Sequence, residues 1–172
     1  RQIIGHGFVG KAVDYAFQDD VEKQIIDPKY DVHLHDVKIE SDVTFVCVPT
    51  PMHKHGQCDV SILEAVINNI KQRMTGLIVI KSTVPPDQID NLFRGSAKHR
   101  MIYNPEFLTE KNANEDIINP FVHIFGGHPD STVKLETFYK DYSICKPCPV
   151  FHMSPTDCLL YTSPSPRDNL PS

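Results

Sequence analysis

Three glycines near the start of the chain have the spacing of a phosphate-binding turn. They stand in the order Gly5-x-Gly7-x-x-Gly10, after a short apolar run and at the start of a helical pattern. In such a turn the first glycine permits the bend, the second lets backbone approach a pyrophosphate, and the third lets helix and strand pack closely. Asp27 ends the next apolar run, where a carboxylate can accept hydrogen bonds from both hydroxyls of a ribose. The pattern therefore predicts a dinucleotide site.

The helix that begins inside this turn adds a partial positive charge for the bound anion. We expect Phe8 and Val9, at its start, to contact the dinucleotide together with the three glycines. The Asp27 carboxylate repels a 2′-phosphate, so NAD is favoured over NADP, although the neighbouring Lys29 works against this preference. The alternative is a purely structural turn, with Asp27 as a surface acid.

Apolar runs and helical patterns alternate along the rest of the chain. Continuous apolar runs are typical of parallel strands that are covered on both faces. The expected strands cover residues 3–4, 24–26, 43–48, 77–80, 101–103, 122–125 and 151–153. The expected helices cover residues 9–17, 61–74 and 131–142, with a short one opening at the prolines 85 and 86. The predicted fold class is α/β: a doubly wound, mostly parallel Rossmann-like sheet with helices on both faces.

Three local features of these elements are expected. Asp59 or Ser61 should cap the second long helix, because their side chains accept hydrogen bonds from its first amides. Gly76 should adopt a left-handed conformation where that helix ends. Val133 should face the core from the helix over residues 131–142.

Composition narrows the class of protein. The 172 residues, 40% of them apolar, suit one ordinary domain rather than a disordered chain. A net charge of -5 and a pI of about 6.0 argue against nucleic-acid binding. No apolar run is long enough for a membrane span. The five cysteines are an odd and unevenly spaced set, which favours free thiols and a cytoplasmic protein, with no metal site.

Three further loops follow expected strands, so they lie at the carboxyl edge where doubly wound sheets bind ligands. They read Val48-Pro-Thr-Pro51, Lys81-Ser-Thr-Val-Pro-Pro86 and Tyr103-Asn-Pro-Glu-Phe-Leu-Thr-Glu110. With the glycine turn, they resemble the N-terminal NAD-binding domain of the UDP-glucose/GDP-mannose dehydrogenase family, most closely its UDP-glucose 6-dehydrogenases. The resemblance runs over residues 3–157.

This resemblance implies an enzyme that oxidises the 6-hydroxymethyl group of a nucleotide sugar to a carboxylate with two NAD molecules. It places Thr50 and Thr83 along the cofactor near its nicotinamide half, and Thr83 also among the catalytic residues. It makes Glu106 the acid/base that handles the hydrolytic water and places it against the substrate. A buried carboxylate beside a reacting carbonyl can activate water in this way.

The same resemblance implies that Phe107 and Leu108 touch the sugar nucleotide and that Glu110 helps to close the cofactor site. Simpler roles remain open for the other loop residues. Thr83 could cap the helix that follows it, Glu106 could be an acid that favours a helix start, and Thr50 could be a turn residue.

The chain departs from the family pattern in its cysteines. The family's nucleophilic cysteine stands in a downstream string, and none of the five cysteines here has that context. Cys145 and Cys148 have the spacing of a redox pair or half a zinc site, without a partner pair. We therefore expect this chain to be inactive alone, and only the full-length protein to form a homodimer. The rival hypotheses are a non-catalytic module that binds NAD or a nucleotide sugar and, less favoured, a short hydroxyacid dehydrogenase.

Both ends of the sequence look cut. The first strand is short and is expected to lack its beginning, so residues 1–157 are predicted to form the NAD-binding domain. Residues 158–172 change abruptly to a Ser/Pro-rich composition and are predicted to be a non-native or disordered tail.

Overall fold

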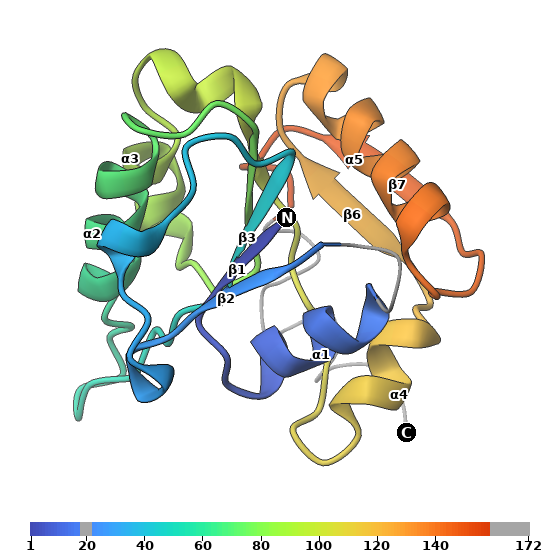
Figure 1. Ribbon diagram of the computed structural model, residues 1–172, viewed down its shortest axis with the longest axis horizontal. Coiled ribbons are helices and arrows are strands. Elements are labelled where there is room, and N and C mark those ends of the chain that lie inside the picture. The colour runs from blue at the N-terminus through green and yellow to red at the C-terminus, as the bar shows by residue number, and fades with distance from the viewer. Residues whose placement is uncertain (18–21, 159–172) are drawn as a thin grey trace.

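The computed structural model of the protein describes residues 1–17 and 22–158. In this part of the chain, seven strands form one sheet in the order β2-β1-β3-β4-β5-β6-β7 (Figure 1). They are β1 (Gln2–Ile4), β2 (Gln24–Ile26), β3 (Val43–Val46), β4 (Leu77–Ile80), β5 (Met101–Tyr103), β6 (His123–Gly126) and β7 (Val150–Met153). All neighbouring pairs are parallel except β5 and β6, which are antiparallel.

The strand order reverses at β1. Strand β2 pairs with one edge of β1 and β3 with the other, so the chain winds outward in two directions from this strand. Sheets of this kind bind ligands beyond the carboxyl ends of the strands at the reversal. The glycine turn leaves β1 at that end of the sheet.

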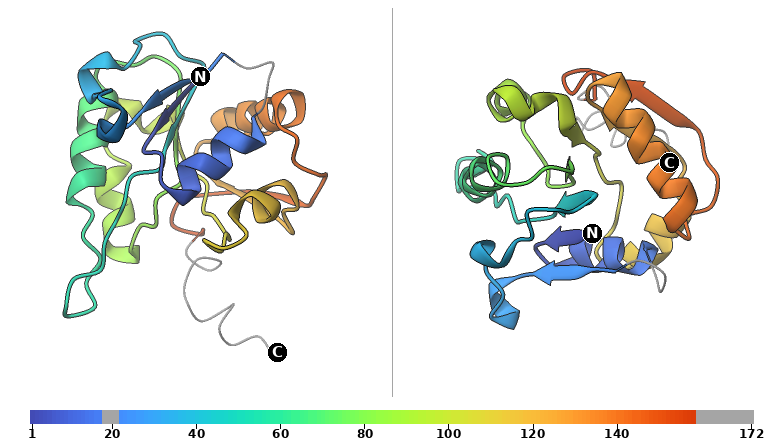
Figure 2. Two further views of the ribbon diagram at one scale, coloured as in Figure 1. Left: turned by 60° about the horizontal axis from the view of Figure 1, so that its bottom comes forward. Right: turned by 45° about the horizontal axis from the view of Figure 1, so that its top comes forward.

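Helices cover both faces of the sheet (Figures 1 and 2). The α-helices are α1 (Phe8–Ala16), α2 (Ser61–Ile70), α3 (Ile89–Leu92), α4 (Ala113–Ile118) and α5 (Pro129–Tyr142). Short 3₁₀ helices are η1 (Pro28–Tyr30), η2 (Leu34–Asp36), η3 (Pro86–Gln88) and η4 (Ser96–Arg100). Buried residues of α2 and α3 share one core cluster, and those of α1, α4 and α5 share the other. The predicted doubly wound α/β fold is confirmed.

The continuous apolar runs have a simple structural reason. Successive side chains of a strand point to opposite faces, and both faces are covered here. Ile3 and Phe45 belong to the cluster under α1, α4 and α5, whereas Ile4 and Val46 belong to the cluster under α2 and α3. The Phe45 ring lies 5.2 Å from that of Phe17, which ends α1, measured between centroids. These contacts fix α1 and the turn before it against the sheet.

Two local predictions about helices are wrong. The N-cap of α2 is Val60, which makes no side-chain cap. Asp59 instead accepts a hydrogen bond at 2.9 Å from the backbone amide of Ser61, so it binds a helix amide from one position further out. On α5, Val133 is exposed, because the buried stripe of this helix passes through Leu135 and Phe138 on another side.

Gly76 is required for a different reason from the one predicted. It does not have the left-handed conformation expected after a helix. A Cβ atom at this position would lie 1.7 Å from the carbonyl oxygen of Ser41. Glycine therefore permits a close approach of two backbone segments at the start of β4.

Cys158, the first residue of the predicted tail, is buried. Its Sγ donates to the carbonyl oxygen of Ser154 at 3.6 Å. The rest of that tail, residues 159–172, lies outside the described residues. Among the helices that the structure describes, none is both long and apolar enough to cross a bilayer.

Candidate functional site

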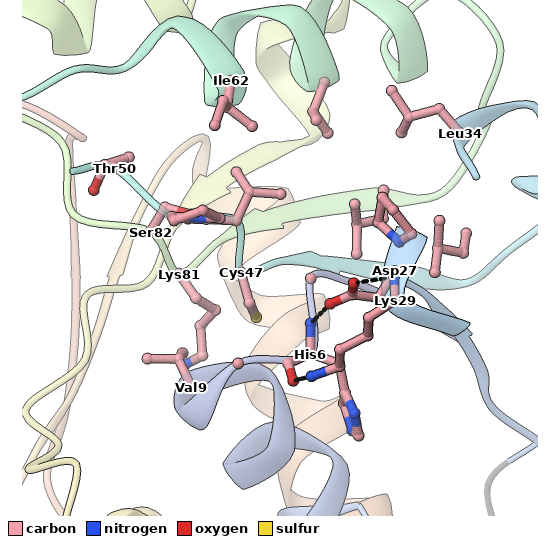
Figure 3. Close-up of a pocket in the computed structure, with 18 of the residues that line it drawn as sticks. His6, Val9, Asp27, Lys29, Leu34, Cys47, Thr50, Ile62, Lys81 and Ser82 are labelled. Atoms are coloured by element: carbon pink, nitrogen blue, oxygen red, sulfur yellow. Dashed lines mark hydrogen bonds between the residues drawn. The ribbon is translucent and has the colours of Figure 1, made fainter. Parts of the chain in front are cut away.

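A cavity of about 960 Å³ lies beyond the carboxyl ends of β1, β2, β3 and β4 (Figure 3). Its size suits a cofactor, since ligand pockets span roughly 300–1,000 Å³. The predicted site residues that line it are Gly5, Gly7, Phe8, Val9, Asp27, Thr50, Thr83 and Glu106. The fold thus brings together loops that are far apart in the sequence.

Gly5 and Gly10 shape the turn after β1. Gly5 has a φ of 91°, and a Cβ there would lie 2.7 Å from the carbonyl oxygen of Cys47. Gly10 does not line the cavity but lies behind it, in α1. A Cβ on Gly10 would lie 1.9 Å from the carbonyl oxygen of Gly5. Both glycines are therefore required by backbone packing, as the sequence pattern predicts for the first and third positions.

Gly7 has a different environment. It is exposed and is the N-cap of α1, and a Cβ built on it would meet nothing within 4 Å. Its carbonyl oxygen accepts the first helical hydrogen bond, from Lys11 at 2.9 Å. The first amides of a helix have no acceptor inside the helix. Because Gly7, Phe8 and Val9 line the cavity, this helix start presents unpaired donors and a positive dipole end beside it.

The Asp27 carboxylate is fixed by backbone amides from two segments. Oδ2 accepts from His6 at 2.8 Å and Oδ1 accepts from Lys29 at 3.0 Å (Figure 3). Burial raises the pKa of Asp27, but the hydrogen bonds from Lys29 and His6 outweigh it, so the pKa lies below its ordinary value. Asp27 is thus an oriented, ionised acceptor at the end of β2.

Lys29 and His6 also line the part of the cavity around Asp27. The Lys29 ammonium donates to the carbonyl oxygen of His6, within the glycine turn. The His6 ring contacts the Tyr30 hydroxyl through Nδ1 at 2.8 Å and the Asp14 carboxylate through Nε2 at 3.2 Å. His6 therefore ties the turn to η1 and to α1. His6 is not predictable from the sequence, because no spacing rule assigns a role to that position of the turn.

An apolar wall faces this corner of the cavity. Its side chains come from β2, from the segment around η2 and from α2. They are Ile26, Val32, Leu34, Ile62 and Val66. Such a wall can pack against a planar base, next to the carboxylate that can bind its ribose.

The loops after β3, β4 and β5 supply the other predicted residues. Thr50 is half-buried and Thr83 is exposed, and both line the cavity. The Ser82 hydroxyl donates to the carbonyl oxygen of Val48 at 2.7 Å, which joins two of these loops. Glu106 reaches the same cavity from the loop after β5. Thr50, Thr83 and Glu106 therefore share one space with the glycine turn and Asp27.

Lys81 is a site residue that was not predicted from the sequence. It directly follows β4, lines the cavity and is only 5% exposed. Its ammonium group forms an ion pair with Glu106 and donates to Asn104 Oδ1 at 2.6 Å and to the Tyr139 hydroxyl at 3.0 Å. Burial lowers the pKa of Lys81 to about 7. A lysine that continues a fully apolar strand is the signal that could have found it.

Three predicted residues are not brought to the large cavity. Among its described lining residues, Phe107, Leu108 and Glu110 do not occur. The Phe107 ring contacts that of Phe121 at a tilted angle with 5.0 Å between centroids, and Leu108 packs against the core under α1. Glu110 is exposed. Their contacts with a substrate or cofactor stay predictions.

The five cysteines, all of which lie within the described residues, form no disulfide bonds. Cys47 lines the cavity but is buried, and burial raises its pKa to about 12. A protonated thiol is a poor nucleophile. Within the described ranges, no cluster of three His, Cys, Asp or Glu residues could hold a metal ion.

The sequence matches the family model described as the NAD binding domain of the UDP-glucose/GDP-mannose dehydrogenase family, over residues 17–143. The UDP-glucose 6-dehydrogenase of Rickettsia bellii is 36% identical over 86 residues, which are 46% of this chain and 20% of that protein. The GDP-mannose 6-dehydrogenase of Pseudomonas aeruginosa is 30% identical over 121 residues, 60% of this chain and 27% of that protein.

The fold is shared with solved structures. The crystal structure of a GDP-mannose dehydrogenase ternary complex from Pseudomonas aeruginosa superposes with a TM-score of 0.75 at 19% identity, covering 98% of this chain and 50% of that one. The chain thus spans about half of that structure, and the matches cover about a quarter or less of the two curated relatives. The chain belongs to the UDP-glucose/GDP-mannose dehydrogenase family and carries that family's NAD-binding domain.

Proposed function

We propose that this chain is the NAD-binding part of a nucleotide-sugar dehydrogenase that oxidises the 6-hydroxymethyl group of UDP-glucose to a carboxylate. In the balanced reaction, one alcohol, one water and two NAD⁺ give one carboxylate, two NADH and three protons. The observation that carries the proposal is the single cavity shared by the glycine turn, Asp27 and Glu106. A cofactor site and a carboxylate suited to proton transfer thus open into the same space.

The residues that line the cavity have the chemical groups needed to bind NAD. The pyrophosphate would bind at the start of α1, where Gly7 leaves open space for it and Phe8 and Val9 present backbone. The ribose next to the adenine would bind the Asp27 carboxylate, and the apolar wall would pack against the base. Thr50 and Thr83 would lie along the nicotinamide half. When bound, NAD accepts the hydride from the substrate carbon.

The cavity also favours NAD over NADP. A 2′-phosphate would have to approach the ionised Asp27 carboxylate, whose two oxygens already accept from backbone amides. Lys29, the nearby cation, is engaged with the carbonyl oxygen of His6. The positive charge that could offset the repulsion is therefore already directed at the turn.

Glu106 is the proposed acid/base of the reaction. It is held at the cavity by Lys81, and a carboxylate in this place can take a proton from water that attacks a reacting carbonyl. In this proposal Thr83, which lines the same cavity, also takes part, while Phe107, Leu108 and Glu110 contact the sugar nucleotide or cofactor only with the remainder of the protein in place. The family nucleophile, the homodimer and a cytoplasmic location belong to the full-length protein.

The second candidate is a module that binds NAD or a nucleotide sugar without catalysis. The high pKa of Cys47 favours it for this chain in isolation, because the thiol that lines the cavity is protonated at neutral pH. Both candidates share the same NAD site.

An absorbance assay for NADH separates the two candidates. The chain of residues 1–172 and the complete gene product are each incubated with NAD and with UDP-glucose, GDP-mannose or UDP-N-acetylmannosamine. We expect turnover of UDP-glucose by the complete product and none by residues 1–172 alone. Turnover of another sugar would correct the substrate. No turnover with any of them would leave the binding module as the function.

A further inference from the structure

Lys81 is a buried cation that contacts three polar side chains. An ammonium group has three N–H donors. Lys81 donates to Asn104 Oδ1 at 2.6 Å and to the Tyr139 hydroxyl at 3.0 Å, and it forms an ion pair with the Glu106 carboxylate. The two hydrogen bonds and the ion pair direct the ammonium group at neighbouring side chains. Lys81 can therefore influence chemistry in the cavity through these partners.

The partners form a closed network with one consistent set of directions. The Tyr139 hydroxyl accepts from Lys81 and donates to Asn104 Oδ1 at 2.8 Å. Asn104 Oδ1 accepts from both of them, and Asn104 Nδ2 donates to the carbonyl oxygen of Ile124 at 3.0 Å. The amide orientation is thus fixed by β6, and the ammonium position by groups from the end of β5 and from α5. Glu106 is the partner that reaches the cavity from this network.

The charge of Lys81 is balanced by Glu106. Four neighbouring groups that act on Lys81 or contact it are neutral at pH 7. These groups are Cys47, His123, Tyr139 and Cys145. Burial raises the pKa of both thiols and of the tyrosine, and burial lowers the pKa of the histidine to about 4. A buried ammonium without a counter-ion is strongly disfavoured. The Glu106 carboxylate is the negative charge that this lysine needs.

The pair also lies at a wall between two cavities. Lys81 and Glu106 line the large cavity, and both line a second one of about 30 Å³ together with Asn104, His123 and Tyr139. Packing alone does not require a charged pair in such a wall, because apolar side chains of similar volume are often at least as stable there. A fixed carboxylate at the edge of the large cavity is what the pair provides.

We propose that Lys81 is the positioning residue of Glu106: it holds the Glu106 carboxylate ionised and oriented at the cavity, while Asn104 and Tyr139 fix the ammonium group for this task. This inference rests on the proposed function, in which Glu106 is the acid/base. Lys81 itself touches neither substrate nor cofactor in this role.

The coupling between the two charges is tested by nuclear magnetic resonance on the chain of residues 1–172 with ¹³C-labelled lysine. The Lys81 Cε signal is followed from pH 5 to pH 10 in the wild type, Glu106→Gln and Glu110→Gln. Glu110 is the matched control, since it is an exposed acid on the same loop. We expect the Lys81 midpoint, about 7 in the wild type, to fall by at least one pH unit in Glu106→Gln and to stay unchanged in Glu110→Gln.

A fall of one unit corresponds to a tenfold change, about 1.4 kcal/mol. An unchanged midpoint in folded Glu106→Gln would overturn the proposal. If Glu106→Gln does not fold, Glu106→Asp is used instead, because it keeps the charge but withdraws it from the ammonium group. An unchanged Lys81 midpoint in Glu106→Asp would likewise overturn the proposal.

Kinetics of the complete gene product test the positioning role. We expect Lys81→Met to lower kcat at least tenfold while the KM for NAD changes less than threefold, and Lys81→Arg to recover part of kcat. Lys134→Met, on the exposed side of α5, is the control. Equal kcat in Lys81→Met and the wild type would refute the role. Separately, NAD titration of the wild-type chain tests the proposed function, because absence of NAD binding with intact coupling would reject that function but not the ion pair.

Discussion

Substitution by alanine should have different effects at two glycines of the same turn: it should lower the stability at Gly10 and the NAD affinity at Gly7. In Gly10→Ala the new methyl group would be built 1.9 Å from the carbonyl oxygen of Gly5, a backbone atom that cannot rotate away. Helix α1 must then move from the turn, and its buried residues Ala12, Val13 and Ala16 lose their fit against the sheet. Overpacking of this kind costs about 1–3 kcal/mol, and a clash with backbone belongs at the upper end.

In Gly7→Ala the new methyl group meets nothing within 4 Å, and the φ of -79° suits alanine. The smaller entropy of the unfolded chain and the poorer N-cap roughly cancel, so stability should stay within about 1 kcal/mol of the wild type. The methyl group does, however, occupy the space proposed for the pyrophosphate. We therefore expect a loss of NAD affinity of at least tenfold without a loss of stability.

Thermal unfolding and NAD titration of residues 1–172 check both expectations. A loss of about 3 kcal/mol corresponds to a Tm lower by about 6–12 °C for a domain of this size, so Gly10→Ala should melt well below Gly7→Ala. A Gly10→Ala chain with the wild-type Tm would refute the packing argument. A Gly7→Ala chain with wild-type NAD affinity would refute the assignment of the pyrophosphate site.

Three other variants test separate parts of the structure. Asp27→Asn keeps an acceptor but loses the charge. The Kd for NAD should therefore rise about tenfold or more, because charge-assisted hydrogen bonds contribute about 1.5–3 kcal/mol. An unchanged Kd, measured by calorimetry, would contradict this expectation. Gly76→Ala should lower the free energy of unfolding by about 1–3 kcal/mol, because its methyl group would meet the carbonyl oxygen of Ser41. The denaturant midpoint should therefore fall, and an unchanged midpoint would count against that close approach. Burial lowers the pKa of Lys81 from 10.5 to about 7, so above pH 7 the unfolded state binds more protons than the folded state and this group's contribution to the free energy of unfolding rises with pH. Between pH 7 and pH 9 the free energy of unfolding of the wild type, measured with denaturant, should therefore rise by about 2 kcal/mol relative to that of Lys81→Met. Free energies of unfolding that change with pH in the same way in both proteins would contradict the burial of the charge.

The fold was predictable because its signals are local. Each buried strand is a continuous apolar run, and the glycine spacing marks the turn after β1 without knowledge of any distant residue. The ends of helices were less predictable. Asp59 binds an amide of α2 from outside the cap position, and Gly76 is fixed by contact with Ser41 rather than by its own conformation. Such contacts depend on how segments approach in space.

The site was predictable only in part, for the same reason. Asp27 and Glu106 follow from motifs, but the network around Lys81 does not. It joins the end of β4 to Asn104 after β5 and to Tyr139 on α5, residues that share no spacing rule. Nor could the sequence reveal that His6 and Lys29 donate their backbone amides to Asp27. These are contacts between distant segments.

The central claim is that the cavity beyond β1 to β4 binds NAD through the glycine turn and Asp27. Titration calorimetry of residues 1–172 with NAD and with NADP tests it most directly. We predict one NAD per chain, with NADP at least tenfold weaker because its 2′-phosphate meets the Asp27 carboxylate. A folded chain that binds neither dinucleotide, or that binds NADP as tightly as NAD, would contradict the claim.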